Sequence, residues 1–177
     1  MPAIHDYICY GASGVCQVED IRLIRFGTGA PAREYYVLQP VGQESASIYV
    51  PADNRSLTDR MRPVLTKDEI DQLLVSVQGE CLPWVEDRKQ RLDVFRGILS
   101  RGDERELLLL ARCLYQKSQK RTNGLPSMEA QILKKAESMI AQGFAFSLHM
   151  EPHQVGDYIR RKLDLSAGHS ESPHKPT

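Results

Sequence analysis

The sequence has no long hydrophobic run, few aromatic residues and no net charge. Its longest wholly apolar stretch, residues 107–111, has only five positions, so we expect neither a membrane-spanning helix nor a secretory signal segment. Aromatic residues make up 7% of the 177 positions and include a single tryptophan. The 23 basic and 23 acidic side chains cancel, and this neutral sum alone argues against a nucleic-acid-binding protein.

Cysteine is scarce and has no motif spacing. The four thiols, Cys9, Cys16, Cys81 and Cys113, form no C-x-x-C pair. Without a secretory signal we expect them to be reduced, in a cytoplasmic protein. A zinc site on His5, Cys9 and Cys16 would match no common spacing and would lack a fourth ligand, so we expect no metal.

Motifs for catalysis are also missing. The glycine turn at residues 11–14 has neither G-x-G-x-x-G spacing nor a following lysine, and Ser13 has no G-x-S-x-G context. His149 and His153 are separated by Pro152, which breaks the helix that would align them as metal ligands. We therefore expect a protein that is not an enzyme and that holds no cofactor.

The zero net charge is the sum of two opposite halves. Residues 1–83 hold 7 basic and 11 acidic side chains, a net charge of −4, whereas residues 84–150 hold 12 basic and 8 acidic, a net charge of +4. Residues 107–128 contain cations and no acid; the cations are Arg112, Lys117, Lys120 and Arg121. Such a stretch can face phosphates or can be a solvated helix face, and charge alone leaves both open.

The first 50 residues have the pattern of short strands. Residues 15–24 and 34–38 are rich in β-prone side chains, and residues 45–50 alternate in part between polar and apolar. Glycine-containing turns separate these runs. Because no helical periodicity precedes residue 64, the pattern predicts a small curled β-barrel.

From residue 66 onward the pattern is helical. Thr66 and Glu69 have capping-box spacing ahead of a periodic run that ends near Gly79, and residues 79–83 form a hinge. Four further helices are predicted; Pro83 lies in the first turn of one, Asp103 and Ser127 cap two, and Pro152 starts the last.

These patterns predict an α+β multidomain chain. The expected parts are a β-barrel at 1–64, a helix and hinge at 65–83, an all-α helical domain at 84–165, and a disordered tail at 166–177.

Trp84, the single tryptophan, is predicted at a helix start, on the edge of the apolar stripe. Four cations follow it closely: Arg88, Lys89, Arg91 and Arg96. An aromatic ring beside basic side chains can wedge into a distorted base step while the cations hold phosphates. Alternatively, Trp84 packs between the two domains, and the residues alone leave both interpretations open.

Four segments carry a resemblance to a known family. They are Tyr10–Ile21 (YGASGVCQVEDI), Glu34–Leu38 (EYYVL), Val50–Asn54 (VPADN) and Arg62–Ile70 (RPVLTKDEI). In order and spacing over residues 7–74 the chain resembles the CarD/CdnL family of bacterial transcription regulators. A looser match extends to about residue 163 through Trp84, Leu92, the turn at 100–103 and the region of Leu114.

The resemblance implies a Tudor-like N-terminal domain that docks on the β subunit of RNA polymerase. It also implies a helical domain that contacts promoter DNA at the upstream edge of the transcription bubble. Transcription-repair coupling factors share the N-terminal fold, but a chain of 177 residues without helicase motifs excludes their motor.

The resemblance can be carried over to single positions. Trp84 matches the family's wedging tryptophan and Lys89 a basic DNA-contact position, whereas Glu86 occupies a second position that is basic in the family. Arg25 lies near one barrel arginine, and Tyr49 stands where some members have arginine. The predicted DNA-contacting residues are Trp84, Arg88, Lys89, Arg91, Arg112 and Lys117. The predicted polymerase-contacting residues are Arg25, Tyr36, Tyr49 and Pro51.

Three functional hypotheses follow. The first is a regulator that docks on the polymerase β subunit, contacts promoter DNA and stabilises the open complex, with no membrane or small-molecule partner. The second is an adaptor on RNA polymerase that binds only protein. A third and remote one is a small-ligand enzyme, which would need a polar pocket.

Overall fold

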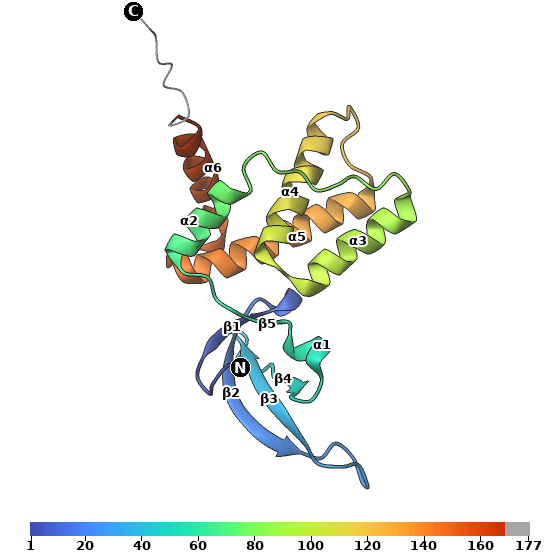
Figure 1. Ribbon diagram of the computed structural model, residues 1–177, viewed down its shortest axis with the longest axis vertical. Coiled ribbons are helices and arrows are strands. Elements are labelled where there is room, and N and C mark those ends of the chain that lie inside the picture. The colour runs from blue at the N-terminus through green and yellow to red at the C-terminus, as the bar shows by residue number, and fades with distance from the viewer. Residues whose placement is uncertain (169–177) are drawn as a thin grey trace, which may run out of the picture.

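The computed structural model describes residues 1–168, with a β-sheet at one end and a group of helices at the other (Figure 1). The strands are β1 (Tyr7–Tyr10), β2 (Val15–Ile24), β3 (Arg33–Pro40), β4 (Ile48–Pro51) and β5 (Met61–Pro63). All their pairings are antiparallel, in the order β4-β3-β2-β1-β5. No helix within the described residues is long and apolar enough to cross a membrane.

The sheet is open, which corrects the predicted barrel. β4 and β5 are its two edges, and within residues 1–168 they do not pair with each other. A register shift between Val18 and Asp20 marks a bulge in β2, which increases local twist and curls the sheet without closing it. The prediction also missed α1 (Arg55–Thr58), a single turn whose N-cap is Asn54, because four residues carry no helical periodicity.

The sheet has its own small core on one face. Tyr36, Leu38 and Val50 from β3 and β4 pack there against residues of β1 and β2, and each is at most 5% exposed. Because side chains alternate across a strand, the neighbours of these residues in sequence lie on the opposite face. That alternation decides which aromatic residues are available to a partner.

The helices are α2 (Lys67–Ser76), α3 (Arg88–Arg101), α4 (Glu104–Gln119), α5 (Ser127–Leu148) and α6 (Pro152–Gly168). The predicted capping box is present, since Thr66 accepts from the Glu69 N–H and the Glu69 carboxylate accepts from the Thr66 N–H. Gly102 ends α3 in the left-handed conformation, and Asp103 caps α4. Ser127 is not a cap as predicted, because it is already helical and Pro126 precedes it.

All five long helices share one core. Phe95, Leu110 and Phe144, from α3, α4 and α5, are among its most deeply buried members. Ile70 and Leu74 bring α2 into the same core, so this helix packs as part of the helical group. α6 continues to Gly168, beyond the start of the predicted disordered tail; the rest of that tail lies outside the described residues.

The linker between α2 and α3 determines where Trp84 lies. Pro83 does not start a helix as predicted: α3 begins only at Arg88, where the Asp87 carboxylate accepts a hydrogen bond from the Gln90 N–H at 2.8 Å. The linker runs from α2 across α4 and α5 to the start of α3, on the side of the helical group away from the sheet (Figure 1). Trp84 is therefore in a segment without regular secondary structure and not on a helix.

Candidate functional site: two surfaces and the seam between them

Trp84 is half-buried at the linker. Its ring packs against the helical core, with its centroid 6.2 Å from that of Phe95. Two cations approach the indole: the Arg91 guanidinium carbon lies 4.5 Å from the ring centroid, and the Lys117 ammonium nitrogen lies 4.1 Å from it. Both distances are within the range of cation–π attraction. Part of the indole surface is thus already occupied by protein.

Arg91 is interior, which removes it from the predicted DNA-contacting set. It is 7% exposed, and its guanidinium bonds Glu129 Oε1 through Nε at 3.1 Å and Nη2 at 2.9 Å. Its remaining Nη1 donates to the carbonyls of Val85 and Glu86, at 2.8 and 2.9 Å. A guanidinium bonded on all sides in this way has no free face for a phosphate.

The other predicted cations fall into two classes. Arg88 and Lys89 are exposed in the first turn of α3, close in sequence to Trp84. Arg112 and Lys117 are half-buried on α4; Arg112 donates to the Val77 carbonyl at 2.8 Å, and Lys117 contacts the indole. Arg88 and Lys89 can bind a phosphate without rearrangement. Arg112 and Lys117 already contact the linker, so they would have to break these contacts before they bind a phosphate.

The four predicted polymerase-contacting residues differ in their exposure to solvent. Arg25 and Tyr49 are exposed, and Pro51 is half-buried on β4. Tyr36 is 5% exposed inside the sheet core, so it cannot reach a partner, and we withdraw it. The error is one of register, because Tyr35 next to it lies opposite Pro51 on the outer face.

Three aromatic rings gather on that outer face. Phe26 stands edge-on to Tyr35 and to Tyr49, with centroid distances of 5.2 and 5.5 Å. We call these three residues the aromatic cluster. Phe26 is 55% exposed and Tyr49 is 41% exposed, beside the edge strand β4. Exposed aromatic side chains next to an edge strand are suited to a protein partner.

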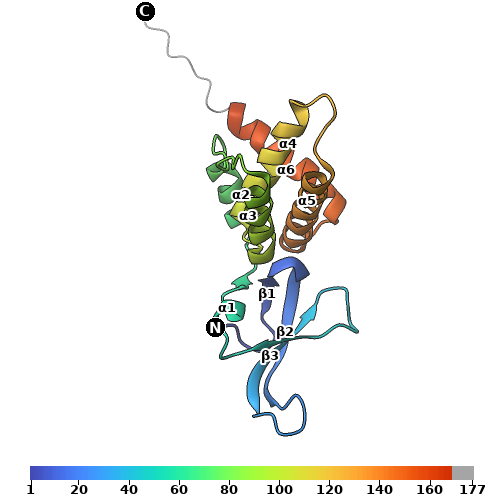
Figure 2. The ribbon, with the colours of Figure 1, turned by 90° about the vertical axis from the view of Figure 1, so that its right-hand side faces the viewer.

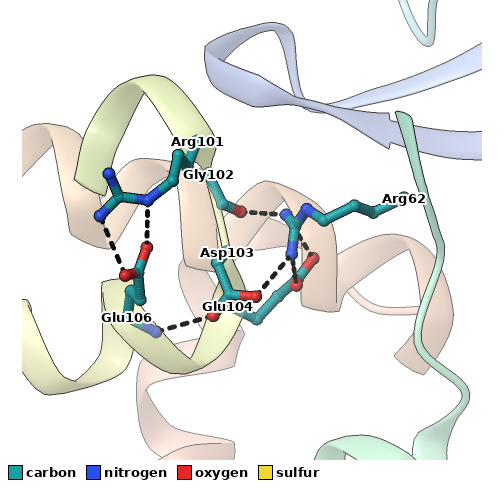
Figure 3. A network of polar contacts seen from close by, with 6 residues as sticks. All are labelled: Arg62, Arg101, Gly102, Asp103, Glu104 and Glu106. Atoms are coloured by element: carbon teal, nitrogen blue, oxygen red, sulfur yellow. Dashed lines mark hydrogen bonds and ion pairs between the residues drawn. The ribbon is translucent and has the colours of Figure 1, made fainter. Parts of the chain in front are cut away.

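A domain seam joins the sheet to the helices (Figure 3). Its centre is Arg62 of β5, which bonds the Gly102 carbonyl and the carboxylates of Asp103 and Glu104 where α3 gives way to α4. Beside it Gly11 and Gly102 touch through their backbones, since a Cβ on Gly102 would lie 3.0 Å from the Gly11 Cα.

The seam separates the two candidate surfaces. The β2–β3 loop, residues 25–32, lies at the end of the molecule farthest from the helices in both ribbon views (Figures 1 and 2). The α2–α3 linker lies on the side of the helical group away from the sheet. The aromatic cluster and Trp84 therefore lie on opposite sides of the seam, which joins the two domains.

An open polar groove of about 670 Å³ lies along the seam. Its lining is Ser56, Asp59, Arg60, Arg62, Arg101, Asp103 and Glu106. Arg62 and Arg101 are both paired with carboxylates, the latter with Glu106 at 2.8 and 2.9 Å (Figure 3). Within the described residues, no group of three or more His, Cys, Asp or Glu side chains could hold a metal ion.

The N-terminal domain matches a known family. Residues 3–65 match the family model described as the CarD-like/TRCF RID domain. The match supports a CarD-like RNA polymerase-interacting domain with a transcription-related role, and it confirms the N-terminal part of the resemblance seen in the sequence. The match ends at residue 65, so α2–α6 lie outside it. No curated protein matches the chain.

Three contributors to these surfaces were missed from the sequence. Phe26 and Tyr35 form the aromatic cluster with Tyr49, and Tyr35 is distinguished from Tyr36 only by the pairing of β3 with β4, which the sequence does not show. Glu129, the buried partner of Arg91, carried no signal, because it is 38 positions away and its neighbours show no charge pattern.

Proposed function

We propose that the protein docks on the β subunit of RNA polymerase through its sheet and contacts promoter DNA through its helical domain, stabilising the open complex. It acts in the cytoplasm by binding alone, without chemistry or a cofactor. The observation that carries the proposal is Trp84, half-buried on a non-helical linker with exposed Arg88 and Lys89 just beyond it, across the helical group from a polymerase-interacting domain.

Polymerase docking would use the aromatic cluster and the outer edge of β4. Residues 48–51 pair with β3 on one side only, so their other backbone groups can pair with a strand of the partner. Exposed Arg25 adds one positive charge beside the cluster. With tyrosine at position 49, this contact depends more on apolar area and strand pairing than on charge.

Positive charge is concentrated in residues 84–150, which carry a net charge of +4 and attract DNA. The sheet domain is nearly neutral, because residues 1–65 hold 6 basic and 7 acidic side chains; residues 66–83, which include α2 of the helical group, hold the remaining net charge of −3. Docking of the sheet then holds the helical domain beside the promoter at high effective concentration, which lets a modest DNA affinity act.

Stabilisation of the open complex would be a shift of populations. A ligand changes the balance of closed and open promoter only by the difference in its affinity for the two. Partial unstacking of a base step costs about a few kcal/mol, and an inserted aromatic ring offsets part of it. Trp84 can supply that contact at a melted edge, while Arg88 and Lys89 neutralise phosphates.

The lifetime of polymerase–promoter open complexes tests the proposal. Trp84→Ala should shorten the lifetime about fivefold if the ring contributes about 1 kcal/mol. Lys89→Glu should also shorten it, and should reduce its salt dependence. Arg161→Glu makes the same charge reversal on α6 and serves as the control. Unchanged lifetimes for both Trp84→Ala and Lys89→Glu would refute DNA contact.

A second candidate is an adaptor that binds polymerase and another protein but no DNA. The packing of Trp84 against Phe95, with two cations over its ring, favours this candidate, because it gives the tryptophan a structural role. Salt dependence separates the two. Counterion release makes DNA affinity fall steeply with salt, whereas an adaptor would leave the promoter lifetime insensitive to Lys89→Glu.

A further inference from the structure

We propose that Arg91 is the positioning residue for Trp84: a buried arginine that holds both the indole and the backbone that follows it. Its consequence at the promoter rests on the proposed function, but its effect on the free protein does not. Arg91 occupies a place that sequence alone assigns to a phosphate contact, and the structure turns it inward.

The geometry joins one group to two parts of the linker. Arg91 Nη1 donates to the carbonyls of Val85 and Glu86, the two residues directly after Trp84. The guanidinium carbon also lies 4.5 Å from the indole centroid. The chain after the ring and the ring itself are thus held by the same planar group.

The guanidinium is in turn anchored in the core. Glu129, in the first turn of α5, is 1% exposed and accepts two bonds from Arg91 through Oε1. Its other oxygen, Oε2, has no hydrogen-bond partner within residues 1–168 but lies 3.9 Å from Arg121 Nη1, a second positive charge. A buried carboxylate holds such a partner firmly, because separation would leave an uncompensated charge in the interior.

Only arginine can make this set of contacts. The fork of five N–H donors reaches a carboxylate and two carbonyls, while the guanidinium carbon lies over the indole ring. A lysine at position 91 would keep the charge but present a single donor point, so it could satisfy the carboxylate or the linker and not both.

Lys117 shows the contrast with a cation that only contacts the ring. It approaches the indole at 4.1 Å from α4 and is half-buried, so solvent or a phosphate can draw it away. Arg91 cannot leave without breaking its bonds to Glu129. The Arg91 contact therefore fixes the orientation of the Trp84 ring. The Lys117 contact is adjustable and covers accessible surface of the ring.

Fluorescence of the free protein tests the inference, because Trp84 is the single tryptophan. Acrylamide, a neutral quencher, reports ring accessibility without responding to the changed charge. Arg91→Lys should raise the acrylamide quenching constant at least about twofold and shift the emission to longer wavelength, as freed linker conformations expose the ring. Arg96→Lys makes the same replacement at an exposed site on α3 and should leave both values unchanged.

Circular dichroism and thermal melting establish that each variant is folded. If Arg91→Lys does not fold, Glu129→Gln replaces it: this variant keeps the shape of the anchor and removes its charge, and it should raise the quenching constant in the same direction. Wild-type quenching in a folded Arg91→Lys, or in Glu129→Gln where only that variant folds, would overturn the inference.

The lifetime of the open complex then tests the consequence at the promoter. Arg91→Lys should shorten it, and adding Arg91→Lys to Trp84→Ala should shorten it no further, because both changes remove the same contact. Additive effects would overturn the positioning role at the promoter. If Trp84→Ala has no effect, the proposed function fails, whereas the quenching result still decides whether Arg91 positions the ring.

Discussion

Replacing Gly102 with alanine should measure the packing at the domain seam. Gly102 has a φ of +68°, and a Cβ there would lie 3.0 Å from the Gly11 Cα and 3.1 Å from the Gly11 carbonyl carbon and oxygen. Gly124 has almost the same φ, +69°, but a Cβ there would meet nothing within 4 Å. Gly124→Ala is therefore a matched control with the same backbone strain and no contact.

Gly102→Ala and Gly124→Ala should differ in free energy of unfolding by the cost of the contact with Gly11. The left-handed conformation costs alanine about 1–2 kcal/mol, and the stiffer unfolded chain returns about 0.4–1 kcal/mol. Gly124→Ala should thus lower the free energy of unfolding by about 1 kcal/mol. At Gly102 the added methyl meets backbone atoms that cannot rotate away, and overpacking adds about 1–3 kcal/mol.

Urea unfolding, followed by far-ultraviolet circular dichroism and by Trp84 fluorescence, gives both free energies on the same scale. Coincident transitions by the two probes would justify a single free energy for each variant. Gly102→Ala should be less stable than Gly124→Ala by about 1–3 kcal/mol. Equal free energies, within about 0.5 kcal/mol, would refute the reasoning that the domains are held by a close backbone contact.

Three further outcomes are expected. Thr66→Ala should lower the free energy of unfolding by about 1 kcal/mol in urea titrations, because it removes the hydroxyl that caps the Glu69 N–H; no change would mean that the cap is unimportant. Burial raises the pKa of the Cys9 thiol to about 12, so a thiol reagent at pH 8 should modify exposed Cys81 and spare Cys9 in native protein, and equal labelling by mass spectrometry would contradict this. Arg62→Met should leave each domain folded but lower the free energy of unfolding by about 1–3 kcal/mol and speed amide exchange at the seam, and unaltered exchange would contradict the role of this arginine.

Local signals in the sequence predicted the local structure well. The strand at 15–24, the capping box at Thr66 and the cap of α4 at Asp103 are each specified by residues within a few positions. Pro83 was misleading, because proline is compatible with a helix start but does not require one. The Asp87 cap, together with the bonds from Arg91 to the linker carbonyls, moves the start of α3 to Arg88.

Contacts between distant residues could not be predicted in the same way. Tyr35 and Tyr36 are indistinguishable by type, and only the pairing of β3 with β4 decides which one faces outward. Arg91 is the buried one of the cations that follow Trp84, because its carboxylate partner is Glu129, a buried residue 38 positions further along the chain. The sheet stays open because its edge strands do not meet, which strand propensity does not encode.

The most direct measurement is the lifetime of the open promoter complex with saturating wild-type protein and with Trp84→Ala. A pull-down with RNA polymerase accompanies it to show that both bind the enzyme equally through the sheet. A regulator that acts through Trp84 should lengthen the lifetime, and the variant should lose most of that effect while still binding polymerase. Equal lifetimes at equal polymerase occupancy would contradict the proposal and favour an adaptor that does not touch DNA.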